Sequence, residues 1–149
     1  MLAVAALLVA MTACGDRRER LPLEGTRWKV VEMDGRADPV FSAEADTFEF
    51  TLDASQRMLY GTGACNRIFG PYELGENGGL DIGGLASTRM ACPNMDLESR
   101  FAKLLEEADE YRIDGDVLTL FDDGRQALVF KGTKAEAPQP ASEPAAVGE

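Results

Sequence analysis

The side chains in this sequence best suited to chemistry are its three cysteines, because the chain contains no histidine. The lack of histidine excludes a Ser-His-Asp triad, a Cys-His pair and any zinc site that uses histidine. Acid–base work would fall to carboxylates, lysine, tyrosine or cysteine, and no spacing singles out a pair among the 26 acidic residues. We therefore expect no catalytic residues, no metal ligands and no cofactor, and a protein that is not an enzyme.

Cys65 and Cys92 form an even pair once Cys14 is set aside as a candidate lipid site. Cys65 lies in a glycine-rich turn, Gly61–Tyr72, between two stretches that are typical of strands. In an exported chain the simplest interpretation is a disulfide, which would stabilise the fold by about 3–4 kcal/mol. Buried free thiols are an alternative, and a reactive thiol is another, although the sequence has no Cys-X-X-Cys motif.

Three polar residues lie close to the two cysteines in sequence: Asn66, Arg67 and Arg89. If the disulfide forms, both arginines lie near it and could bind an anionic group, so the three residues are a candidate binding patch. The alternative is structural. Asn66 would then fix the turn through bonds from its side chain to the backbone, and the arginines would pair with surface carboxylates.

The amino-terminal segment Met1–Ala13 is apolar, uncharged and too short to be a transmembrane helix. Together with Cys14 it resembles the cleavage box of a bacterial lipoprotein, which predicts a signal peptide over 1–13, a lipid on Cys14 and a tether over 14–22. An ordinary signal peptide is the alternative. We expect an envelope protein anchored by lipid and facing the periplasm, with the outer membrane favoured over the inner.

The formal charge of the chain is −11 over 149 residues. Such an acidic balance argues against a nucleic-acid partner and against a basic membrane-binding surface. The length predicts one domain, and we expect a monomer.

Alternating apolar residues and turn signals predict a mainly β fold. In Thr47–Leu52 the apolar side chains of Phe48, Phe50 and Leu52 share one face, as in a half-buried strand. Two Asp-Gly pairs between apolar runs predict a meander of hairpins near the carboxyl end. Further strands are expected at 28–33, 58–62, 68–74, 80–82, 85–90, 111–113, 117–121 and 127–131, with a loop over 36–46.

One segment has the periodicity of a helix, at about 94–108, with Asn94 as its expected cap. From Thr133 onward the sequence is rich in Ala, Pro, Glu and Ser, which predicts a disordered tail over 133–149. These elements predict a small antiparallel barrel or sandwich of about eight strands with one packed helix.

An ordered set of motifs resembles the META domain, or HslJ-like, family of bacterial envelope proteins. The resemblance spans about residues 22 to 131 and implies a META domain over 23–132. The motifs are Leu23–Trp28, Gly63–Asn66 with Gly70 and Tyr72, Thr88–Cys92, and Glu98 with Phe101 ahead of Leu104 and Leu105. This resemblance implies a barrel-like β fold with a packed helix, an envelope location, and an association with heat-shock or antibiotic stress. It implies no reaction.

We expect a non-catalytic module that binds an envelope protein, a peptide, or a small hydrophobic or anionic ligand, in envelope maintenance or stress tolerance. One alternative is a periplasmic inhibitor of a cell-wall hydrolase of the lysozyme type, since the chain is acidic and small disulfide-bridged barrels occur in that class. An enzyme using carboxylates or a thiol is the other alternative.

Overall fold

The computed structural model describes residues 19–43 and 47–134 of the chain. The expected signal peptide over 1–13, the lipid site Cys14 and the tail beyond Lys134 lie outside these residues, as does most of the expected tether. Within the described residues, neither the length nor the apolar content of any helix suffices to cross a membrane.

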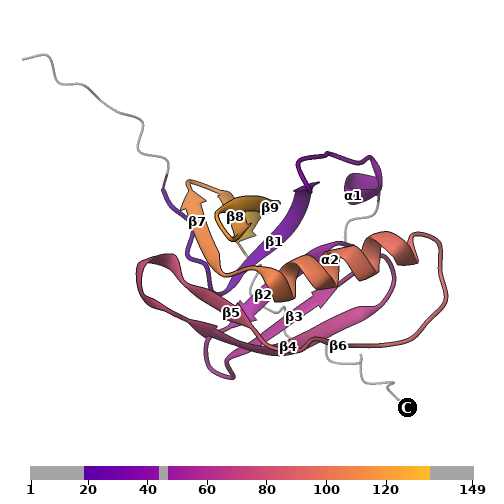
Figure 1. Ribbon diagram of the computed structural model, residues 1–149, viewed down its shortest axis with the longest axis horizontal. Helices are drawn as coiled ribbons and strands as arrows, with labels where there is room; N and C mark the ends of the chain where they lie inside the picture. Colours follow the sequence, from indigo (N-terminus) through magenta and orange to yellow (C-terminus); the bar gives the residue numbers. More distant parts are fainter. Residues whose placement is uncertain (1–18, 44–46, 135–149) are drawn as a thin grey trace, which may run out of the picture.

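Nine strands, all paired antiparallel, form one continuous sheet (Figure 1). The strands are β1 (Thr26–Met33), β2 (Glu49–Asp53), β3 (Met58–Thr62), β4 (Arg67–Leu74), β5 (Leu80–Ile82), β6 (Ala86–Ser87), β7 (Glu110–Asp114), β8 (Val117–Asp122) and β9 (Arg125–Lys134). The helical segments are α1 (Val40–Ala43), the short 3-10 turn η1 (Glu76–Gly78) and α2 (Met95–Glu107). The prediction of a mainly β fold with one main helix is therefore confirmed.

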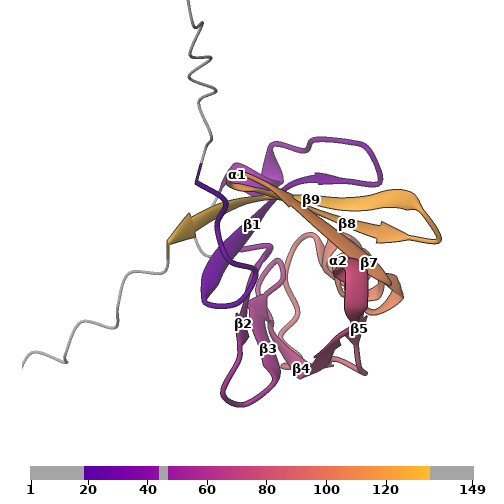
Figure 2. The same cartoon turned by 90° about the vertical axis from the view of Figure 1, so that its left-hand side faces the viewer.

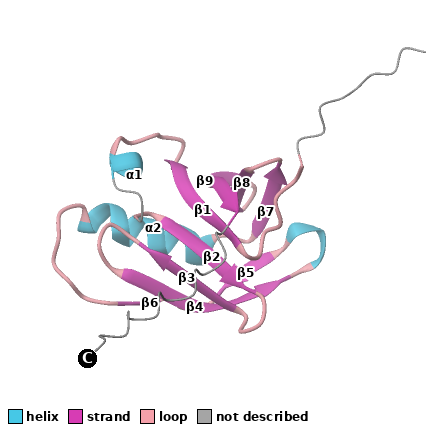
Figure 3. Ribbon diagram, turned by 180° about the vertical axis from the view of Figure 1, so that it is seen from behind, coloured by secondary structure: helices cyan, strands magenta, loops and turns pink. Residues whose placement is uncertain are grey.

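The sheet curls into a nearly closed barrel. Its order is β5-β4-β3-β2-β1-β9-β8-β7, with β6 beside β4. The end strands approach each other where the N–H of Leu80 donates to the carbonyl of Asp109 at 3.0 Å. Figure 2 shows α2 close to β5 and β7, and Figure 3 shows the molecule of Figure 1 from behind. The helix thus covers the open side of the curled sheet.

The core follows from the alternation of apolar residues along the strands. Every second residue points inward, so Phe50 and Leu52 of β2 are buried together with Leu118 and Leu120 of β8. The rings of Phe50 and Phe130 meet edge to face at 5.0 Å between centroids. Helix α2 completes this interior with three fully apolar side chains, Phe101, Leu104 and Leu105.

The helix agrees with its expected range and Asn94 occupies its N-cap position, but the expected capping bond from the side chain is not formed. Asn94 precedes α2 in the left-handed conformation, with φ of 68°, and its side chain makes no capping hydrogen bond. Only its backbone carbonyl contributes, by accepting the N–H of Glu98 at 3.0 Å. The expected loop over 36–46 also contains the short helix α1, at whose start the N–H of Val40 donates to the Asp38 carboxylate at 2.9 Å.

Tertiary partners shift three further boundaries. The strand expected over 85–90 is reduced to the two residues of β6. Strand β9 continues to Lys134, beyond the expected domain end at 132, because the start of β1 supplies pairing partners for Thr133 and Lys134. At the other end, Leu21 already packs against the core and its N–H donates to the carbonyl of Gly115 at 2.9 Å, although the tether was expected to reach residue 22.

Candidate functional site

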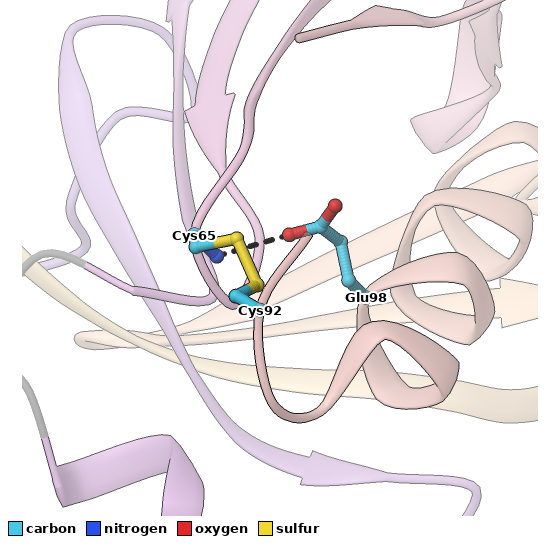
Figure 4. A group of neighbouring side chains, drawn as sticks. All are labelled: Cys65, Cys92 and Glu98. Carbon is cyan, nitrogen blue, oxygen red and sulfur yellow. Dashed lines mark hydrogen bonds between the residues drawn. A yellow bond between two sulfur atoms is a disulfide. The ribbon is translucent and has the colours of Figure 1, made fainter. Parts of the chain in front are cut away.

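The disulfide joins the turn between β3 and β4 to the segment that leads into α2. Cys65 and Cys92 are bonded, with their Cα atoms 6.5 Å apart and a separation of 27 positions in sequence (Figure 4). That separation lies within the range that a disulfide spans. The predicted disulfide is confirmed, and the two thiol alternatives are wrong.

Asn66 is fully buried beside this disulfide and uses both ends of its amide. Its Nδ2 donates to the carbonyl of Met90 at 3.1 Å and to Oε1 of Glu98 at 2.7 Å. Its Oδ1 accepts the N–H of Met90 at 2.8 Å and the hydroxyl of Thr88 at 2.9 Å. The prediction that Asn66 belongs to a binding patch is therefore wrong, because no part of this side chain is left for a ligand. Its bonds fix the segment around residues 88–90, which is the structural alternative.

Glu98, in the first turn of α2, holds the same turn from the helix side (Figure 4). Its Oε2 accepts the backbone N–H groups of Cys65 and Asn66, both at 3.0 Å. Burial on its own raises the pKa of the Glu98 carboxyl, but these N–H donors and the Asn66 amide outweigh it and lower the pKa below its ordinary value. Glu98 is thus a carboxylate that stays ionised in the interior.

Gly63 allows this carboxylate to approach the turn. A Cβ on Gly63 would lie 2.3 Å from Cγ of Glu98 and 2.6 Å from its Oε2, distances that real side chains do not reach. We name the set formed by Gly63, Asn66, Glu98 and the Cys65–Cys92 disulfide the Asn66–Glu98 cluster.

Sequence reasoning missed Glu98 as the centre of this cluster. The signal was present, because Glu98 precedes Phe101 by three positions and Leu105 by seven, which places it on the buried face of the helix. An acidic residue on such a face needs hydrogen-bond donors nearby, and a turn rich in glycine supplies them.

The two arginines of the candidate patch are both exposed. Arg67 lines a surface hollow of about 560 Å³ over β3 and β4, and Arg89 lines another of about 430 Å³ beside α2. Within residues 19–43 and 47–134, neither guanidinium has a carboxylate at ion-pair distance. The structure therefore separates the arginines into two neighbouring hollows, which share Ile68 and Thr88 in their walls.

The hollow over β3 and β4 also contains two exposed aromatic side chains that sequence reasoning did not single out. Tyr60 and Phe69 are opposite each other across the two strands, and 43% and 41% of their surfaces are exposed. Arg67 lies two residues before Phe69 on the same outward face of β4. We name Tyr60, Phe69 and Arg67 the aromatic platform. The signal for it was the alternation along β4, which places Phe69 opposite in direction to the buried Ile68.

Among the described residues, one group of acidic and sulfur-containing side chains is close enough together to resemble a metal site. Its members are Cys65, Cys92 and Glu98. The two sulfur atoms are bonded to each other and are not thiolates. The Glu98 carboxylate is occupied by N–H donors. The arrangement therefore serves as a structural clamp.

Comparison with known proteins identifies the family. The profile of the META domain matches residues 21–135 of this chain. The chain belongs to the META domain family. This confirms the resemblance seen in the sequence, and no curated protein matches the chain.

Solved structures resemble this META domain over most of its length. A solution structure of a protein from Burkholderia xenovorans is 28% identical, with a TM-score of 0.59, and the match covers 89% of this chain and 94% of that one. A second solution structure is 27% identical, with a TM-score of 0.56 and coverage of 73% and 90%. A crystal structure of a DUF4847 family protein from Bacteroides vulgatus ATCC 8482 shares the fold at 19% identity, with a TM-score of 0.54 and coverage of 76% and 96%.

The motifs that identify this META domain have structural roles in it. Trp28 is fully buried and its indole N–H donates to the carbonyl of Leu23 at 2.8 Å. The buried hydroxyl of Tyr72 donates to Glu24, and burial together with this carboxylate raises the pKa of Tyr72 to about 12. These motif residues therefore stabilise the fold.

Proposed function

We propose that this META domain is a non-catalytic binding module of the bacterial envelope that acts in envelope maintenance or stress tolerance through its aromatic platform. In this proposal a lipid on Cys14 anchors the protein, which faces the periplasm as a monomer without a cofactor or a nucleic-acid partner. The disulfide supports an oxidising compartment, because such bonds persist mainly in exported proteins.

The observation that carries the proposal is the exposure of Tyr60 and Phe69 side by side across β3 and β4. Aromatic residues and arginine are enriched where proteins bind one another, and aromatic side chains bury a large area with few rotatable bonds. Arg67 adds a cation with no ion-pair partner in the described chain. The platform therefore suits a ligand that combines an apolar part with an anionic group.

The chemistry of the hollows supports binding rather than catalysis. The carboxylate beside the aromatic platform, Glu49, is ion-paired with Arg27 at 2.8 Å. Glu98, at the other hollow, has a lowered pKa and accepts several N–H groups, so it is a poor general acid. A carboxyl that donates a proton near neutral pH needs a raised pKa, whereas the pKa of Glu98 is lowered.

The test is complementation of a strain that lacks the gene, with survival under antibiotic or heat stress as the measurement. We expect the wild type to restore survival and the double variant Tyr60→Ser/Phe69→Ser to fail, although its thermal unfolding midpoint is unchanged. The matched control is Val31→Ser, which removes an exposed apolar side chain, 40% exposed, from β1 and should restore survival.

Full rescue by the platform variant would contradict the proposed role of the aromatic platform. Inhibition of lysozyme by the pure protein would instead support the alternative of a hydrolase inhibitor.

A further inference from the structure

Strand β6 presents a free edge. Ser87 is opposite Ile68 of β4, and the ladder bond next to this pair runs from the N–H of Thr88 to the carbonyl of Arg67 at 3.1 Å. In an antiparallel ladder, this places Ser87 in a pair without hydrogen bonds, so its N–H and C=O point away from β4. In the part of the chain that the structure describes, no group bonds to either of them.

This free edge faces helix α2 across a groove. The N–H of Leu85, two residues before Ser87, donates to Oε1 of Glu106 on the helix at 2.6 Å. Ser87 lines the same hollow as Met95, Ser99 and Ala102 of α2, so the free edge borders the space between β6 and the helix. The groove between them is the hollow of about 430 Å³ that Arg89 lines. Figures 1 and 3 show where β6 and α2 lie in the fold.

The groove has apolar walls and small residues where a ligand would need room. Met90 on the strand side and Met95 on the helix are exposed by 57% and 36%. Ser99 and Ala102 lie four and seven residues after Met95 on the same face of α2. Their small side chains leave room in the groove beyond the methionine. Methionine side chains adapt their shape to different apolar partners.

Arg89 supplies a positive charge to the groove, and the carboxylates near it already accept backbone N–H groups. Glu98 accepts hydrogen bonds from the turn, and Glu106 accepts one from Leu85. Arg89 has no ion-pair partner within the described residues, and it lies two residues after Ser87 of the free edge. An acidic residue of a ligand at this edge would complement it.

We propose that an extended segment of a partner protein, with apolar and acidic side chains in alternation, pairs with β6 as an added strand. The inference rests on the proposed function as a binding module and names the class of partner. Main-chain hydrogen bonds to Ser87 supply affinity, and alternate side chains enter the groove between Met90 and Met95 or meet Arg89.

The probe is a fluorescein-labelled peptide in which valine and glutamate alternate, and binding is measured by fluorescence anisotropy. Ser87→Pro removes the free N–H and leaves the ladder bonds at Ala86 and Thr88, and Ser87→Ala is the matched control. We expect binding to wild type and Ser87→Ala, with about tenfold weaker binding to Ser87→Pro because one hydrogen bond is lost. In wild type, hydrogen exchange at the Ser87 amide should slow when the peptide is added.

A second variant tests the groove without touching the strand. Ser99→Trp fills the groove from α2, whereas Lys103→Trp places the same ring on an exposed position outside it. We expect only Ser99→Trp to abolish peptide binding, which also covers the case in which Ser87→Pro does not fold.

Three results would overturn the inference: no binding of the peptide to wild type, equal binding to Ser99→Trp and Lys103→Trp, or equal binding when lysine replaces glutamate in the peptide. None of these results affects the complementation test of the aromatic platform, so the two proposals fail separately.

Discussion

At the scale of single residues, the burial of the Glu98 carboxylate raises the question of what compensates it. A charge removed from water is tolerated when it is paired or fully hydrogen-bonded. Glu98, which is 5% exposed, accepts two backbone N–H groups and the Asn66 amide, and it lies in the first turn of α2, where the helix dipole favours negative charge. The compensation therefore comes from oriented N–H dipoles.

Glu98→Gln should destabilise the fold by about 2 kcal/mol, because hydrogen bonds to a charged group are lost. The new amide NH₂ would also face Nδ2 of Asn66, and Asn66 cannot turn over without losing its bonds to Met90 and Thr88. The measurement is urea unfolding followed by the fluorescence of Trp28, the one tryptophan of the sequence.

The control for this substitution is Glu107→Gln on the same helix. Glu107 is an exposed carboxylate paired with Lys103 at 3.5 Å, and such pairs contribute less than about 1 kcal/mol. Equal unfolding midpoints for the two variants would show that Glu98 does not hold the turn.

At the scale of elements, the disulfide connects the β3–β4 turn to the entry of α2, which the Asn66 bonds also secure. We expect Cys65→Ser/Cys92→Ser to fold and to lose about 3–4 kcal/mol of unfolding free energy on the chain-entropy model. The reason for folding is that Asn66 still bonds the backbone of Met90 when the sulfur bond is absent. The measurement is urea unfolding with and without a dithiol reductant.

In this experiment the reductant should lower the stability of wild type and leave the double serine variant unchanged. Backbone NMR shifts should change around Cys65, Cys92 and the start of α2. Loss of the folded signal set in the double variant would contradict the role assigned to Asn66.

The elements also show how far sequence reasoning reaches. Local patterns were sufficient for the Asp-Gly hairpins, the alternation in β2 and the stripe of α2, because each depends on neighbours within a few residues. They failed where a distant partner decides: β9 reaches Lys134 because β1 pairs with it, and β6 ends early because the chain turns to meet Asn66. Asn66 was assigned to a binding patch for the same reason, since its burial depends on α2, 32 residues away at Glu98.

At the scale of the whole molecule, carboxyl groups whose pKa is lowered by folding make the free energy of unfolding depend on pH. The folded state lowers the pKa of Glu98 below its ordinary value of 4.5, mainly through N–H donors that outweigh its burial. The Arg100 hydrogen bond lowers the pKa of Asp34 in the same way. A carboxyl with a lowered folded pKa adds stability above its unfolded pKa and loses it as the pH falls through the folded value.

We therefore expect the unfolding free energy to be steady from neutral pH to about pH 5 and to fall below that. Glu98→Gln should fall less steeply, by at most about 1.4 kcal/mol per pH unit, because one titrating group is missing. Urea midpoints measured as a function of pH test this. Parallel curves for wild type and Glu98→Gln would contradict the assignment of the acid sensitivity to Glu98.

The lack of a side chain at Gly63 limits which substitutions this sequence can accept during evolution. With a Cβ at position 63 only 2.3 Å from the acid on α2, neither position is free to vary alone. A lineage that gained a methyl group at Gly63 would have to shorten or remove the acid at Glu98 and then find other acceptors for two amides of the turn. The two sites are therefore bound to evolve as a couple, 35 positions apart in the gene yet in contact across the fold.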